Sequence, residues 1–128
     1  MKGRISIEIR IPGSGGSRKS SASRYHRGLI CPQTPPQLAQ SLADLASART
    51  PIRLGGRFSK DRIGGRLRAE GATVSTRSLN RILRYRPNDL TISVESGVAW
   101  SALQQELGRN RQMIPLDPPW EASCTVGG

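Results

Sequence analysis

The segment IRLGGRFS, residues Ile52–Ser59, is the part of the sequence that most constrains the fold. It begins as a short apolar strand and runs directly into the pair Gly55 and Gly56. Glycines allow backbone N–H groups to turn toward one concavity and allow a bulky anion to approach the chain, and Ser59 adds a hydroxyl donor. A Gly pair after a strand is also common in plain tight turns. The segment alone therefore leaves an anion cradle and a simple turn as alternatives.

Two common nucleotide-binding motifs are absent from the sequence. No G-x-G-x-x-G opens a helix at this loop, and no Gly-Lys-Ser/Thr triplet occurs. A Rossmann-type site and a Walker-type site are therefore excluded.

Apolar spacing on either side of the loop predicts a series of short helices and strands. Thr34, with two prolines directly after it, favours a helix start, and the Leu spacing that follows predicts a helix over 35–48. We expect strands over 51–54, 72–75 and 90–94, helical turns around 79–83, a turn at 87–89, and a second helix over 101–111. This order predicts the α+β fold class, a small sheet with flanking helices.

The N-terminal residues differ in composition from the rest of the chain. Residues 1–31 are basic and rich in Ser and Gly, and such a composition does not offset its ordering entropy, so we expect a disordered lead. The domain is expected to occupy residues 32–128.

Charge and cysteine content narrow the function classes. The 128 residues carry 20 Lys+Arg against 9 Asp+Glu, a net charge of +11, but residues 87–128 contain only two arginines against five acids. A small basic nucleic-acid-binding module remains an alternative, although scattered aromatics and the absence of one basic helix argue against a nucleic-acid partner. No apolar run approaches the ~20 residues of a membrane span. Two Cys and one His supply no set of spaced ligands, so we expect no metal site. Two Cys are also too few for a disulfide scaffold, so we expect a cytoplasmic protein.

A second glycine-containing segment follows near the C-terminus. PLDPP at Pro115–Pro119 is a rigid corner, and TVGG at Thr125–Gly128 offers further backbone donors beside a ligand. Taken alone, this segment is only a loop.

The segments taken in series resemble the FAD-binding domain of the vanillyl-alcohol oxidase and p-cresol methylhydroxylase type, found in FAD-linked oxidases. Over 78–83, 88–98 and 115–119 the chain is similar to the FAD-binding subunit of glycolate oxidase, and the similarity covers about residues 32–128. The resemblance implies the first subdomain of such a domain, present in its N-terminal part and incomplete. It implies a flavin-dependent oxidoreductase acting on a small 2-hydroxy acid such as glycolate, with partner oxidoreductase subunits possible for the parent enzyme.

The same resemblance implies which residues bind the cofactor. The first Gly loop would wrap the FAD pyrophosphate, and the C-terminal segment would meet the cofactor from the opposite side. The implied cofactor-binding residues are Gly55, Gly56, Arg57, Phe58, Ser59, Pro118, Thr125, Gly127 and Gly128.

The chain departs from the family pattern in its loop. Arg57 stands at a usual glycine and Phe58 at a usual small residue or His. If the family's glycine at this position has positive φ, Arg57 carries backbone strain here. If only the backbone N–H at this position matters, Arg57 can lend a positive charge to phosphate. No His lies in the loop, so FAD is expected to be bound non-covalently.

The chain stops at Gly128, where relatives continue into the second FAD subdomain and a substrate domain. Catalytic residues therefore stay unknown, and we expect the chain alone to be inactive. A non-functional truncated remnant is a further alternative.

Overall fold

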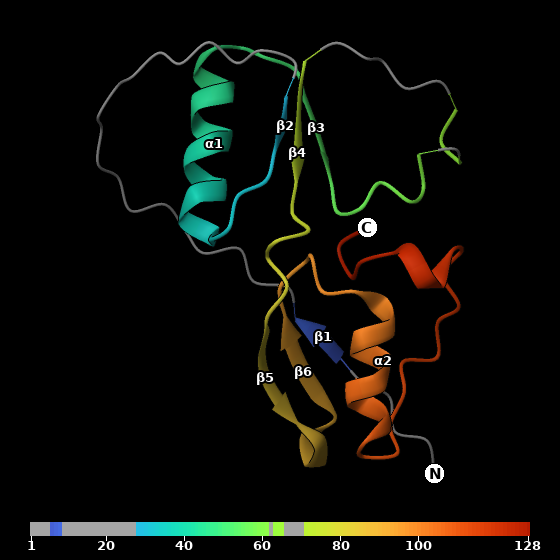
Figure 1. Cartoon of the computed structure of the whole chain (residues 1–128). Helices are drawn as coiled ribbons and strands as arrows, with labels where there is room; N and C mark the ends of the chain where they lie inside the picture. Colours follow the sequence, from blue (N-terminus) through green and yellow to red (C-terminus); the bar gives the residue numbers. More distant parts are fainter. Residues whose placement is uncertain (1–5, 9–27, 62, 66–70) are drawn as a thin grey trace.

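The computed structural model describes residues 6–8, 28–61, 63–65 and 71–128 of the chain. Its helices and strands form two groups, each with one helix and a three-stranded sheet (Figure 1). The elements are β1 (Ser6–Glu8), β2 (Leu29–Ile30), α1 (Pro35–Ser47), β3 (Ile52–Gly55), β4 (Ala72–Ser75), β5 (Ile82–Arg86), β6 (Thr91–Val94) and α2 (Trp100–Gly108). Short 3-10 turns occur at Pro87–Asp89 and Glu121–Ser123.

The first group is a parallel sheet in the order β2-β4-β3, with α1 beside it (Figure 1). The helix begins where the sequence predicts, because the Thr34 side chain accepts a hydrogen bond from the Gln37 N–H and prolines occupy the first turn. Leu45 of the helix packs on Ala72 and Val74 of β4, and all three are buried. Burial of this apolar face anchors α1 to the sheet.

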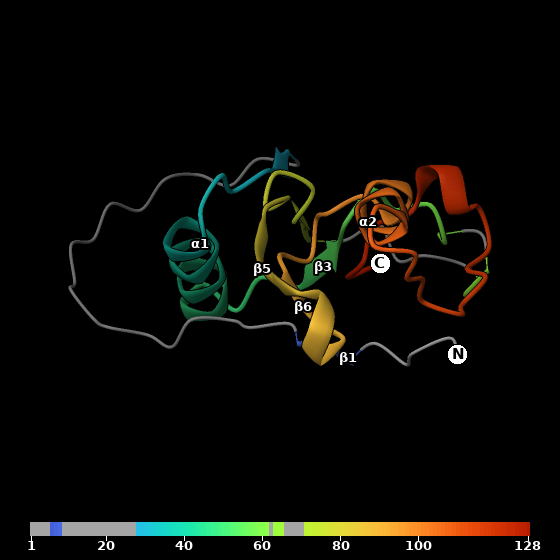
Figure 2. The ribbon, with the colours of Figure 1, turned by 90° about the horizontal axis from the view of Figure 1, so that it is seen from below.

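The second group contains the larger core. Its sheet has the order β1-β6-β5, with β1 parallel and β5 antiparallel to β6. The helix α2 lies beside this sheet, as both ribbon views show (Figures 1 and 2). The buried residues of this core are Ile92, Val94, Val98, Trp100, Leu103, Leu107, Ile114 and Cys124. The α+β prediction is confirmed, with two small sheets where one was expected.

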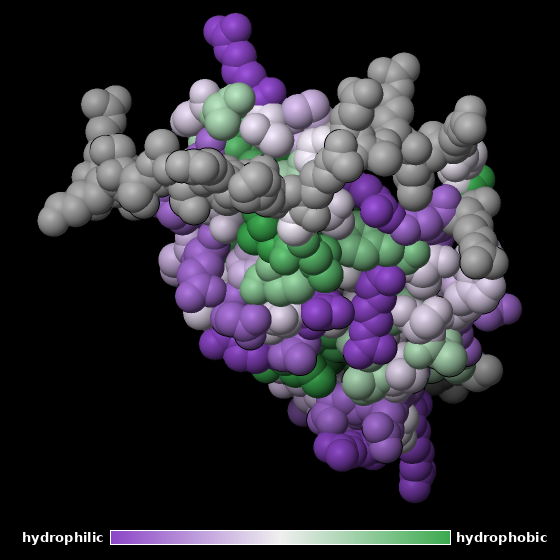
Figure 3. All heavy atoms as spheres, turned by 45° about the horizontal axis from the view of Figure 1, so that its top comes forward, coloured by the Kyte–Doolittle hydropathy of each residue, from purple (hydrophilic) through white to green (hydrophobic). Residues whose placement is uncertain are grey.

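The free edge of β3 retains apolar side chains at the surface. Ile52 pairs with Ala72 and Leu54 with Val74, so all four point to the face that α1 covers. Yet Ile52 and Leu54 stay 39% and 55% exposed, because the helix packs over β4. Green patches of apolar residues amid purple hydrophilic ones are visible on one face of the molecule (Figure 3).

The prediction of helical turns around 79–83 is wrong. Residues Ile82–Arg86 are strand β5, and Ile82 pairs with Val94 of β6. An irregularity between Ile82 and Arg84 shifts the register, and Leu79 is buried in the loop before the strand. The helix-like spacing of apolar residues therefore comes from a loop residue followed by a bulged strand.

The second helix is shorter than predicted, and the lead contains strands. The helix α2 ends at Gly108, and Arg111 has φ of 55°, with which a right-handed helix cannot continue.

Within the expected lead, residues 1–31, Ser6–Glu8 pairs with β6 and Leu29–Ile30 pairs with β4. The other residues of the expected lead up to 27 lie outside the described residues, and for them disorder stays a prediction.

Over the residues that the structure describes, neither helix has the length and apolarity needed to cross a bilayer.

Candidate functional site

The first wall of the site is the loop that follows β3. Two hydrogen bonds from the end of β4 hold its carbonyls: the Thr76 N–H donates to Gly55 O (2.8 Å), and Ser75 Oγ donates to Gly56 O (2.7 Å). The backbone N–H groups of residues 56–60 donate no hydrogen bond to any described residue. Five consecutive donors are thus left for a ligand or solvent, and such a supply of unengaged N–H groups is what an anion-binding loop requires.

The backbone conformation of the loop distinguishes the two alternatives for Arg57, which were backbone strain and a charge offered to phosphate. Phe58 has φ of 56°, whereas Arg57 is not among the residues with positive φ. Of the two alternatives for Arg57, the one with backbone strain therefore does not apply, and the positive φ occurs at Phe58 instead. The Phe58 ring folds back so that a Cβ added to Gly55 would lie 2.6 Å from its Cε1. The ring thus occupies the space of a side chain at Gly55, and any larger residue there would displace it.

The second wall is the C-terminal segment Thr125–Gly128. The Val126 N–H donates to Val98 O (2.9 Å), and the Gly127 N–H donates to Ser96 O (2.8 Å). A Cβ on Gly127 would lie 2.6 Å from the Cβ of Ser96, so only glycine allows this close approach. The segment is thus fixed to the turn between β6 and α2.

The two walls touch at Gly56 and Thr125. A Cβ built on Gly56 would lie 1.9 Å from Thr125 Oγ1, and one built on Gly128 would lie 4.0 Å from the Gly56 nitrogen. The C-terminus accordingly ends beside the loop after β3 (Figure 1). The tertiary structure therefore brings together two segments that are about 70 residues apart in sequence.

Between the walls lies a cleft of about 260 Å³. Its lining residues are Leu54, Gly55, Gly56, Arg57, Phe58, Ser59, Lys60, Asp61, Gly64, Gly127 and Gly128. Seven of the nine residues expected to bind cofactor are in this lining. Thr125 lies against Gly56 behind the lining, and Pro118 does not line the cleft.

The sequence reasoning missed three polar or small lining residues, Lys60, Asp61 and Gly64. Lys60 and Asp61 directly follow the predicted loop, so two adjacent charged residues at its end were the signal that could have found them. Gly64 lies further on, and only the return of the chain toward the cleft reveals it.

A buried hydroxyl at the junction has no partner. Thr125 is 4% exposed, and its Oγ1 forms no hydrogen bond with any described residue. Leaving such a group unsatisfied costs about 1–3 kcal/mol. A ligand oxygen beside Gly56 would satisfy it, which makes this hydroxyl a test of whether a cofactor fits.

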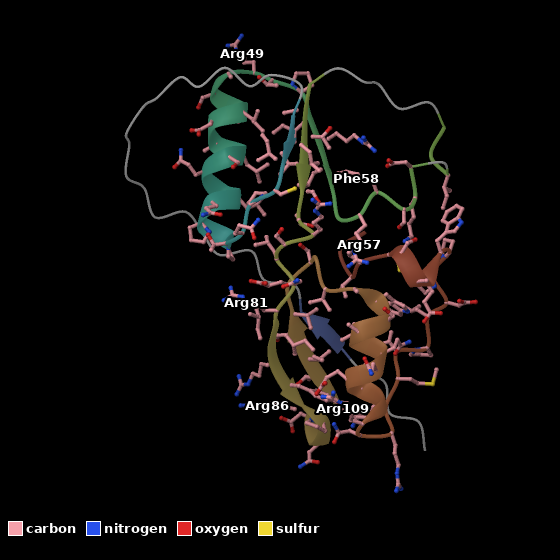
Figure 4. The ribbon with its side chains drawn as sticks, in the orientation of Figure 1. Arg49, Arg57, Phe58, Arg81, Arg86 and Arg109 are labelled. Atoms are coloured by element: carbon pink, nitrogen blue, oxygen red, sulfur yellow. The ribbon has the colours of Figure 1, made fainter. Side chains whose placement is uncertain are left out.

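The charges of the cleft suit an anion. Arg57 is exposed and lies on the side of the loop that faces the C-terminal segment (Figure 4), and Lys60 adds a second cation to the lining. The one lining carboxylate, Asp61, forms an ion pair with Arg53. Elsewhere in the described chain, three arginines pair with acids: Arg81 with Glu95, Arg86 with Asp89 and Arg109 with Glu106. Arg49, Arg77 and Arg111 are exposed and form no ion pair with a described residue, so unpaired cations also occur away from the cleft. In the cleft, unpaired cations share one lining with unengaged N–H donors.

Metal ligands do not gather in this region. Among the described residues, no three His, Cys, Asp or Glu side chains come together as a metal site. The cleft is instead lined by glycine backbone, the Ser59 hydroxyl, the cations Arg57 and Lys60, the Asp61 carboxylate and the apolar side chains of Leu54 and Phe58.

Comparison with known proteins agrees with this geometry. A family model described as an FAD binding domain matches residues 27–128, which include both walls of the cleft. No curated protein matches the chain. The orphaned Thr125 hydroxyl and the unengaged N–H groups fit a pyrophosphate-bearing cofactor. The chain belongs to the family of FAD-binding domains of the p-cresol methylhydroxylase type, found in FAD-linked oxidoreductases.

Proposed function

We propose that the cleft holds the pyrophosphate of non-covalently bound FAD in a flavin-dependent oxidoreductase that acts on a 2-hydroxy acid such as glycolate. The observation that carries the proposal is the run of unengaged N–H groups over 56–60, whose residues line the same cleft as Gly127 and Gly128. Its volume of about 260 Å³ is below the ~300–1,000 Å³ of a whole drug-sized ligand pocket. The cleft therefore suits part of a large cofactor, and its donors suit the diphosphate part.

Each wall has its own role in this proposal. The backbone N–H groups and the Ser59 hydroxyl donate to phosphate oxygens, and Arg57 and Lys60 supply the positive charge. The Thr125 hydroxyl is buried behind Gly56 and does not line the cleft, so in this proposal the Gly56 loop shifts on FAD binding and lets this hydroxyl donate as well. When bound, FAD supplies hydride acceptance, and the residues of this chain bind and orient it.

Non-covalent attachment rests on the loop sequence. The resemblance would place a flavin-attaching His in this loop, and no His stands there over 55–59. Acid precipitation of the loaded protein should therefore release all flavin into the supernatant. Flavin that stays with the pellet would contradict this part of the proposal.

Support for the 2-hydroxy acid is the sequence resemblance to the glycolate oxidase subunit over 78–83, 88–98 and 115–119. In the parent enzyme, glycolate added under anaerobic conditions should bleach the flavin absorbance. Ethylene glycol, which lacks the carboxylate, is the matched control and should leave the spectrum unchanged. Bleaching by neither compound would remove the substrate assignment and leave FAD binding standing.

The cofactor assignment is tested at Thr125. Thr125→Val keeps the shape of the side chain and removes the hydroxyl, whereas Thr125→Ser keeps the hydroxyl. Without FAD, the valine variant should be more stable by about 1 kcal/mol, because an unsatisfied buried group is removed. With FAD, its Kd should rise roughly tenfold, and the serine variant should stay within about threefold of the original. Equal FAD affinity of the valine variant and the unaltered chain in a calorimetric titration would contradict the assignment.

A further inference from the structure

One acidic side chain lies where an anion is proposed to bind. Asp61 lines the cleft beside the Gly loop, and its side chain is 33% exposed. A carboxylate at this place repels phosphate oxygens, and the repulsion is substantial where surrounding protein lowers the dielectric constant. The cleft therefore needs a means of neutralising Asp61.

Arg53 of β3 is the neighbouring cation. Its guanidinium pairs with the Asp61 carboxylate, and its Cζ also lies 4.5 Å from the centroid of the Phe58 ring. The ring in turn covers Gly55, as its close approach to a Cβ built there shows. The guanidinium is thus held between an aromatic face and a carboxylate, and both of these side chains line the cleft.

We infer that Arg53 is a positioning residue for the cofactor: it neutralises Asp61 and keeps that carboxylate turned from the phosphate. This inference rests on the proposed binding of FAD. Arg53 does not line the cleft and makes no direct contact in this role. Arg57 and Lys60, whose side chains have no ion pair with a described residue, are then left to attract the anion.

The test is a charge rescue measured as FAD affinity of the full chain. Arg53→Met removes the cation and keeps an apolar stem, so Asp61 is left as an uncompensated charge. The Kd for FAD should rise about tenfold. The double variant Arg53→Met with Asp61→Asn removes the repulsion as well, and its Kd should return to within about threefold of the unaltered chain. If Arg53 had a merely structural role, removing the Asp61 charge would not restore the FAD affinity of Arg53→Met.

Matched controls separate this effect from a general loss of charge. Arg86→Met removes an arginine from another exposed pair, with Asp89, away from the cleft, and should leave the Kd unchanged. If Arg53→Met does not fold, as judged by circular dichroism, Arg53→Lys is used instead. Lysine keeps the positive charge, so its Kd should stay within about fivefold.

The outcomes are distinguishable. Unchanged affinity of Arg53→Met, or a double variant as weak as the single one, would overturn the role of Arg53 while FAD binding stands. A tenfold increase in Kd for Arg53→Lys would overturn it as well. Absence of FAD binding by the unaltered chain would instead overturn the proposed function.

Discussion

Substitution of Gly56 by alanine should separate the two walls of the cleft. The new Cβ would lie 1.9 Å from Thr125 Oγ1 and 3.1 Å from Thr125 Cβ. Ordinary contact between such atoms needs roughly 3.5 Å, so the segments must move apart by about 1.5 Å or the Thr125 side chain must rotate into packed surroundings. Overpacking of this kind costs about 1–3 kcal/mol. For a chain of this length, 2 kcal/mol corresponds to a fall in Tm of roughly 6–10 °C.

The companion variant identifies the clash as the cause. Thr125→Ala removes Oγ1 and Cγ2, the atoms 1.9 and 3.3 Å from the new Cβ, and keeps Thr125 Cβ at 3.1 Å. Added to Gly56→Ala, it should restore about 1–2 kcal/mol, because the largest overlap disappears. Urea unfolding of the two single variants and the double variant measures this coupling.

Gly108→Ala provides the control for glycine replacement as such. A Cβ at Gly108, the last residue of α2, meets nothing within 4 Å. This variant should gain up to about 1 kcal/mol, since alanine favours helix. The reasoning would be refuted if Gly56→Ala were as stable as the unaltered chain, or if the double variant lost the full sum of the two single effects.

Two further predictions concern stability away from the cleft. The Arg81 side chain donates to the buried Glu95 carboxylate and lowers the pKa of this carboxyl. The ionised carboxylate therefore stabilises the fold above its unfolded-state pKa of about 4.3. This stabilisation is lost as pH falls through the lower pKa of the folded state. Glu95→Gln should therefore flatten the dependence of the unfolding free energy on pH between about 5 and 2, and an unchanged acid limb in urea titrations would contradict this. Leu103→Ala, at a fully buried position, should cost about 2–5 kcal/mol in the same assay. Leu83→Ala, at a side chain that is 50% exposed, should change stability by less than about 1 kcal/mol, and similar losses for both would contradict the assigned core.

The elements with local signals were predictable. The helix α1 begins at a Thr cap with prolines in its first turn, and the three strands expected over 51–54, 72–75 and 90–94 occur within one residue of those bounds. In each case, the preference of a few neighbouring residues agrees with the final packing. Local consistency is what allowed these predictions.

Strand β5 was not predictable from its own residues. Its apolar spacing resembles a helical turn, and its identity as a strand depends on pairing with β6. The Glu95 side chain accepts a hydrogen bond from the Arg81 N–H (2.9 Å), and the Glu95 N–H donates to Arg81 O (2.9 Å). Such pairing involves residues 14 apart, which local propensity does not include.

The sequence by itself determined that a strand ends in a flexible glycine pair, that a second glycine pair closes the chain, and that the two belong to an FAD-type pattern. Only the tertiary structure decided why these glycines are needed. Gly55 and Gly56 have no positive φ; Phe58 and Thr125 occupy the space in which their side chains would lie. The tertiary structure alone also placed Arg53 on Asp61. The conformational preference of a residue depends on its neighbours in sequence. Whether there is space for its side chain depends on which distant atoms the fold brings close to it.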